Sequence, residues 1–223
     1  MKRIAAGLAG VLAALALGFW AYGALKQRDL VEAVVSLVGD TSAELKEALS
    51  LEAASSLAGT PEAVSRLERY ARSTTMRLEA LRAMETWRDP ELADAAKSYL
   101  SAARQLLQNQ VASHRHRAHF ADSTEILREH MSAASRRTDG WIEEALRRKR
   151  QVDRDYGEYR FAVETFGRLL AAYPEARSGL ASRMDRGLLV EDTLVKEARA
   201  RVLQAGKRAG AEMEKARQLA APR

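Results

Sequence analysis

The sequence predicts an all-α protein in which an N-terminal transmembrane helix is followed by an elongated antiparallel helical bundle with coiled-coil-like seams. The run at residues 4–25 carries no charged side chain, and the rest of the chain places apolar residues three and four positions apart over long stretches. Alanine, leucine, arginine and glutamate dominate, and the 223 residues include only four prolines. These abundant residues favour helices, and no segment shows the alternation typical of a strand.

Residues 4–25 form the predicted membrane segment. About 22 residues at 1.5 Å per residue give a helix of roughly 33 Å, which matches the hydrocarbon thickness of a bilayer. Trp20 and Tyr22 lie near its far end, where aromatic rings settle at the headgroup level. We therefore expect a basic head at residues 1–3, a signal-anchor at 4–25 and an extracytoplasmic bundle at 26–223.

A cleaved signal peptide is the alternative for this segment, because Ala21, Tyr22 and Gly23 fit a cleavage motif before Ala24. The apolar run exceeds the usual length of such a leader, which favours the uncleaved anchor. Small residues recur at every fourth position and would let two membrane helices approach closely, unless they only reflect an alanine-rich composition. This predicted membrane-helix contact comprises Ala6, Gly10, Ala14 and Gly18.

Flanking charges leave the orientation nearly balanced. Lys2 and Arg3 precede the segment, and Lys26 and Arg28 follow it. The free amino terminus adds positive charge to the first side. We expect a single-pass protein of the inner (cytoplasmic) membrane, with its N-terminus in the cytoplasm and its bulk in the periplasm.

Composition excludes several classes of protein. The chain has no cysteine, which rules out a disulfide framework and thiolate metal sites. Hydrophobic residues at 47% and charged residues at 30% indicate a folded chain. The net charge of +6 is spread along the chain, whereas nucleic-acid-binding proteins concentrate their positive charge, so we expect no nucleic-acid partner.

Glycine and capping residues delimit the first helices of the bundle. Residues 39–41 (Gly-Asp-Thr) predict an interruption, after which Thr41 and Glu44 fit a capping box for a helix over residues 42–57. Thr60, followed by proline, predicts the next helix start. A heptad seam then runs through Val64, Leu67, Ala71, Thr74, Leu78 and Leu81.

The third helix is predicted to start at Asp89-Pro90 and to run to about residue 136. Its seam is apolar at both ends and polar in the middle, at Gln110, Ser113 and Arg117. Because no glycine or proline breaks it, we expect one continuous helix, with a hinge near residues 118–122 as the alternative.

Two further helices complete the predicted bundle. Residues 138–140 (Thr-Asp-Gly) predict a turn, and apolar residues then alternate without a break from Val152 to Tyr173. We expect this helix to end at Pro174 and the last one to span residues 178–219. Five helices with short connections predict an antiparallel bundle.

The sequence shows no catalytic or cofactor signature. The four histidines fall within 17 residues, yet on one helix they point apart or lie too far along the axis to converge on a metal ion. No nucleophile with its base and no nucleotide fingerprint occurs in a usable context. We therefore expect no enzymatic activity, cofactor or metal.

Two stretches are candidate binding sites. The densest basic run suits anionic groups, although Glu143 and Glu144 lie four residues before its first two members and can pair with them. This run comprises Arg147, Arg148, Lys149 and Arg150. The polar stretch of the third helix offers a candidate ligand pocket at Gln110, His114 and Arg117.

Together these features predict a membrane-anchored extracytoplasmic bundle that acts as an envelope scaffold, adaptor or assembly factor through protein–protein contacts. Its expected partners are the membrane and either other envelope proteins or a second copy of the chain, bound through helix seams. The alternatives are a ligand-binding sensory or carrier bundle, and a cytoplasmic basic domain that binds anionic lipid or nucleic acid.

Overall fold

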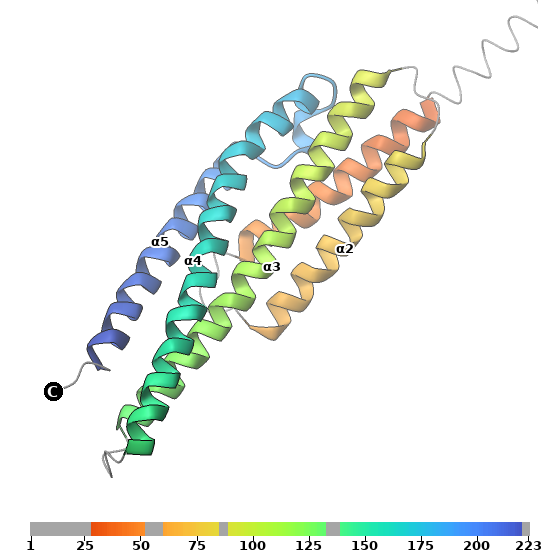
Figure 1. The fold of residues 1–223 in the computed structure, drawn as a ribbon. Helices are drawn as coiled ribbons and strands as arrows, with labels where there is room; N and C mark the ends of the chain where they lie inside the picture. Colours follow the sequence, from red (N-terminus) through yellow and green to blue (C-terminus); the bar gives the residue numbers. More distant parts are fainter. Residues whose placement is uncertain (1–27, 52–59, 85–88, 133–138, 220–223) are drawn as a thin grey trace, which may run out of the picture.

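The computed structural model describes residues 28–51, 60–84, 89–132 and 139–219. These ranges contain five α-helices and no strand, which confirms the predicted all-α class (Figure 1). Residues 28–51, called helix 28–51 below, come first. The others are α2 (Pro61–Ala83), α3 (Pro90–Ser132), α4 (Asp139–Ala181) and α5 (Asp192–Leu219), with a 3₁₀ turn, η1 (Arg186–Leu188), before α5.

The predicted anchor at residues 4–25 lies outside the described part of the chain. Over the residues that are described, none of the helices combines the length and the apolar character that crossing a bilayer requires. The anchor, its contact stripe and the membrane orientation therefore stay predictions.

Two predicted helix starts are confirmed by their capping bonds. The Ala63 backbone N–H donates to Thr60 Oγ1 at 3.3 Å, with proline in the first turn of α2. The Leu92 backbone N–H likewise donates to Asp89 Oδ1 at 2.9 Å at the start of α3. Beyond this cap α3 is a single helix to Ser132, as expected, without a hinge at residues 118–122.

The predicted interruption at residues 39–41 is wrong, because helix 28–51 runs through it. Thr41 and Ser42 are buried, and Ser42 Oγ lies 2.6 Å from Tyr99 Oη of α3. Glu44 does not cap a helix but accepts from both terminal nitrogens of Arg77, at 2.6 and 3.0 Å. Tertiary contacts thus use the polar groups that locally favour a cap.

The predicted end at Pro174 is also wrong, since α4 contains this proline and continues to Ala181. An interior proline removes one backbone hydrogen bond. Tyr173 and Leu180 lie on either side of it, and both are fully buried, so continuing the helix keeps Leu180 in the core. The same helix already includes Asp139 and Gly140, where a turn was predicted.

Helix α4 ends at Ala181, and the last helix starts at Asp192 rather than at residue 178. Asp185 caps η1 by accepting from the Gly187 backbone N–H at 2.9 Å. Leu189 and Val190 follow with no exposed surface and fix this connection to the core.

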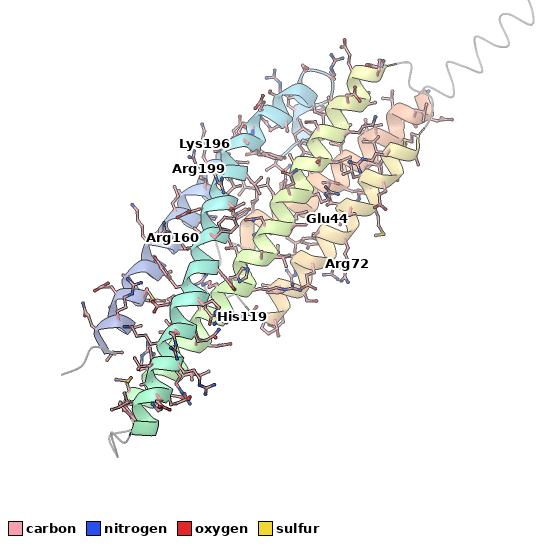
Figure 2. The ribbon with its side chains drawn as sticks, in the orientation of Figure 1. Glu44, Arg72, His119, Arg160, Lys196 and Arg199 are labelled. Atoms are coloured by element: carbon pink, nitrogen blue, oxygen red, sulfur yellow. The ribbon has the colours of Figure 1, made fainter. Side chains whose placement is uncertain are left out.

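The bundle is elongated and narrows along its length (Figure 1). Helix 28–51 and α2 lie along the first part of α3, and the remainder of α3 packs against α4 and α5. The aromatic core joins the layers, with the Tyr99 and Tyr173 rings 5.7 Å apart. Charged side chains such as Arg72, Arg160 and Lys196 extend outward (Figure 2).

Candidate functional site

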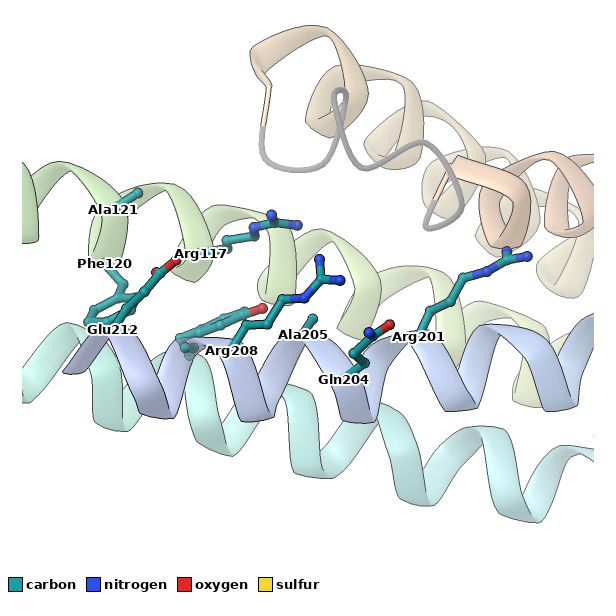
Figure 3. Close-up of a pocket in the computed structure, with 10 residues that line it drawn as sticks. Arg117, Phe120, Ala121, Arg201, Gln204, Ala205, Arg208 and Glu212 are labelled. Carbon is teal, nitrogen blue, oxygen red and sulfur yellow. The ribbon is translucent and has the colours of Figure 1, made fainter. Parts of the chain in front are cut away.

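A groove lies between α3 and α5 (Figure 3). It encloses about 510 Å³, and Tyr159 of α4 contributes to its base. We name it the α3–α5 groove. Its walls consist of Arg117, Phe120 and Ala121 from α3, and Arg201, Gln204, Ala205, Arg208, Ala209 and Glu212 from α5.

Small residues of α5 determine how closely this helix lies on α4. A Cβ atom added at Gly206 would lie 3.0 Å from Val163 Cγ1, and one at Gly210 would lie 3.3 Å from Tyr156 Oη. Only glycine therefore permits this packing without displacing α4 side chains. The neighbouring Ala205 is also small, so α5 leaves open space on the side that faces α3.

Aromatic rings form the base of the α3–α5 groove. The Phe120 ring centre lies 5.5 Å from that of Tyr156, tilted by 52°, and 6.3 Å from that of Tyr159, with the planes 16° apart. Phe120 and Tyr159 are almost fully buried. This cluster keeps the base rigid and largely apolar.

Three guanidinium groups and one carboxylate line the α3–α5 groove. Arg201 donates to Glu197 at 3.1 Å. Among the described residues, no carboxylate lies within 4.0 Å of the guanidinium group of Arg117 or Arg208. Figure 3 shows both side chains extending into the space between the two walls. Their positive charges are therefore available to an anionic partner.

The predicted ligand pocket is divided by the structure. Gln110 is fully buried, and its Nε2 donates to the Ala48 carbonyl at 2.7 Å, so it holds two helices together. His114 is buried and lines, with Arg117, a crevice of only about 10 Å³. Of the three predicted residues, only Arg117 reaches the α3–α5 groove.

The α5 wall was not predicted from sequence. A signal was present, because Arg201 and Arg208 are seven residues apart and therefore share one face of the helix. Gln204 and Ala205 lie between them on that face. Nothing in the α5 sequence indicates that this polar face lies opposite Arg117.

The basic run on α4 is partly neutralised. Arg147 donates to both carboxylate oxygens of Glu144 at 2.8 Å, and Arg148 donates to the same carboxylate at 2.6 Å. The predicted Glu144–Arg148 pair is confirmed, whereas the structure pairs Arg147 with Glu144 rather than with Glu143. The two arginines lower the pKa of Glu144 through these hydrogen bonds. Anion contact by this run stays a prediction.

The histidines have separate environments. His116 Nδ1 lies 3.2 Å from a Glu158 oxygen, and the His130 ring stacks on Trp141 with centres 4.8 Å apart. His114 is buried and His119 is exposed. In the part of the chain that is described, no group of three or more metal-ligating side chains converges on a point.

Buried tyrosines have shifted acidities. Burial raises the pKa of Tyr99 and of Tyr173, which face each other in the core. Burial and a hydrogen bond to Glu47 raise the pKa of Tyr70 to about 12. These hydroxyls stay neutral at ordinary pH and act as structural hydrogen-bonding groups.

Comparisons with protein families, with curated proteins and with solved structures gave no match for this chain. The inferences below therefore rest on its residues and geometry.

Proposed function

We propose that the chain is a membrane-anchored scaffold, adaptor or assembly factor of the cell envelope, which holds other proteins through the surfaces of its helical bundle. The anchor is the apolar segment at residues 4–25. The bundle extends from it into the periplasm.

The α3–α5 groove is the observation that carries this proposal. It is open, it extends along about three turns of α5 and one turn of α3, and Arg117 and Arg208 have no carboxylate partner among the described residues. Such an elongated groove with unpaired charges on its walls suits a protein segment better than a compact metabolite, which is usually enclosed on most sides.

Cross-linking in intact cells tests the proposal. A photo-reactive amino acid is placed at Ala205 in the full chain, with the exposed Arg72 as the control position on another face. We expect a discrete cross-linked protein from Ala205, found in the membrane fraction. A chain that is recovered as an uncross-linked monomer from both positions, or from the soluble fraction, would contradict the proposed function.

Topology is tested separately. Protease protection in spheroplasts, together with the mass of the mature chain, reports the side of the membrane and any cleavage after Gly23. We expect the bundle to be digested only once the outer barrier is removed, and residues 1–25 to be retained.

A ligand-binding sensory or carrier bundle is the second candidate. The volume of about 510 Å³ falls within the range of small-molecule sites, which supports it. A thermal-shift screen with small organic anions tests it, because a ligand that binds only the folded state raises Tm. No stabilisation by any of them would remove this candidate.

A further inference from the structure

Helix 28–51 packs on one face of α3, and its last described residues lie beside the middle of α3. Ser42 contacts Tyr99 at 2.6 Å, and Ala48, near the end of the helix, accepts from Gln110 at 2.7 Å. These two α3 positions are eleven residues apart, about three helical turns, so they lie on the same face.

The same face of α3 continues into the α3–α5 groove. Arg117 and Ala121 follow Gln110 by seven and eleven residues, and both line the groove. Helix 28–51 is described to residue 51, whereas α3 continues to Ser132. The groove therefore lies on the line that helix 28–51 follows along α3.

The walls of the α3–α5 groove suit a helix. Ala121, Ala205 and Ala209 are small and allow a helix backbone to approach to the lower end of the usual interaxial range, about 8 Å. Ala121 is exposed and Ala205 is partly exposed, so their methyl groups can contact the apolar seam of such a helix, while the almost fully buried Phe120 only supports them from beneath. A docked helix would add one more helix to the narrow part of the bundle.

The charges select an acidic helix. Arg201 and Arg208 on one wall are two turns apart, about 10.5 Å, and Arg117 lies on the other wall. Docking would remove water from Arg117 and Arg208, which have no carboxylate partner within the described ranges, so the occupant is expected to supply one for each. Glu212 of the wall and Glu197, the ion-pair partner of Arg201, offset two of the three guanidinium charges and leave a positive excess of one.

We propose that the α3–α5 groove binds an acidic amphipathic helix of a partner protein, with an apolar seam on Ala121 and Ala205 and carboxylates on both flanks toward Arg117 and Arg208. The proposal rests on the adaptor function above and adds the chemical class of the partner. Acids seven residues apart on the partner helix match the spacing of Arg201 and Arg208.

Designed peptides test this inference on the full chain in detergent. One peptide of about three heptads carries leucine and alanine in its seam and glutamate on both flanks, and its twin carries lysine in place of glutamate. Fluorescence anisotropy reports binding. We expect the acidic peptide to bind, with an affinity that falls as salt is raised, and the basic peptide not to bind.

Charge reversal locates the binding. The double variant Arg117→Glu with Arg208→Glu is expected to bind the acidic peptide at least about tenfold more weakly and to gain affinity for the basic one. The matched control is Arg72→Glu with Arg82→Glu, which reverses the same number of charges at exposed positions of α2 and is expected to bind as the wild type does. Circular dichroism and Tm confirm that both variants are folded.

Several outcomes would overturn the inference. They are absent binding, equal binding of both peptides, equal losses in the two double variants, and competition by inorganic phosphate or phosphatidylglycerol vesicles, which would indicate a general anion site. Binding only after residues 52–59 are replaced by a Gly-Ser linker would make that segment the occupant. Concentration-dependent dimerisation that the Arg117→Glu, Arg208→Glu variant abolishes would make a second copy the occupant.

Cross-linking in cells separates this inference from the proposed function. If the full chain captures a membrane-fraction protein through another face while the acidic peptide fails to bind, the adaptor function stands and the inference is wrong. If Ala205 captures a protein, the cross-linked segment must be a helix with acidic flanks. A basic or extended segment there would overturn the inference alone.

Discussion

Replacing Gln110 by leucine tests the contact between the end of helix 28–51 and α3. Gln110 is fully buried and its amide donates to the Ala48 carbonyl at 2.7 Å. Ala48 is itself fully buried, so water cannot replace this donor at its carbonyl. The variant Gln110→Leu keeps the volume but removes the donor.

The expected loss follows from a core carbonyl that loses its side-chain donor. An unsatisfied buried acceptor costs about 1–3 kcal/mol. The added apolar surface of leucine offsets part of this, about 1 kcal/mol at most. We expect the free energy of unfolding to fall by about 1–2 kcal/mol, which lowers Tm by roughly 2–8 °C for a chain of this size.

Urea unfolding followed by circular dichroism measures the change. The control is Gln108→Leu, an exposed position on the same helix, where we expect a change within about 0.5 kcal/mol. If Gln110→Leu matched or exceeded the stability of the wild type, the contact with Ala48 would not hold the helix and the reasoning would be refuted.

Three other predictions concern stability. Arg77→Leu should lower the free energy of unfolding by about 1–2 kcal/mol, because it removes the ion-pair partner of the Glu44 carboxylate, which is only about a fifth exposed. Adding Glu44→Leu should restore most of the lost stability, as measured in a double-mutant cycle by urea unfolding. Gly157→Ala should raise Tm, since its Cβ meets open space and alanine favours helix by about 1 kcal/mol; Gly206→Ala, which meets Val163, should gain less or lose. The pKa of Tyr70 in the folded chain, about 12, exceeds its unfolded value near 10. The stability that this shift contributes is complete below about pH 10 and is lost as pH rises toward 12. Ultraviolet titration measures the tyrosine pKa values, and in alkaline unfolding the Tyr70→Phe variant should lose less stability between about pH 10 and 12 than the wild type.

Local chemistry predicted the starts of α2 and α3. Thr60 and Asp89 cap through atoms within three residues, so the sequence alone contains both partners of each bond. The prediction failed where the partner is distant. Ser42 hydrogen-bonds to Tyr99, 57 residues away, and Glu44 accepts from Arg77, 33 residues away. These contacts stabilise the part of helix 28–51 that follows its glycine.

Proline misled the prediction for a similar reason. Pro174 ends a helix on local grounds, but Leu180, six residues later, is fully buried in the core. Continuing the helix loses one backbone hydrogen bond, but it buries Leu180, which stabilises the fold by about 2 kcal/mol. Only the tertiary position of Leu180 decides between the two.

The polar stretch of α3 is best explained by what covers it. Tyr99 and Leu106 are buried and precede the position where α3 meets the end of helix 28–51, and Gln110 lies under that end. Arg117 lies beyond it and is partly exposed. A seam position without a covering helix faces water, so a charged side chain there costs nothing in the free chain. Covering it would require ion pairs in place of the lost hydration, and for this reason we propose acidic flanks on the helix that binds the α3–α5 groove.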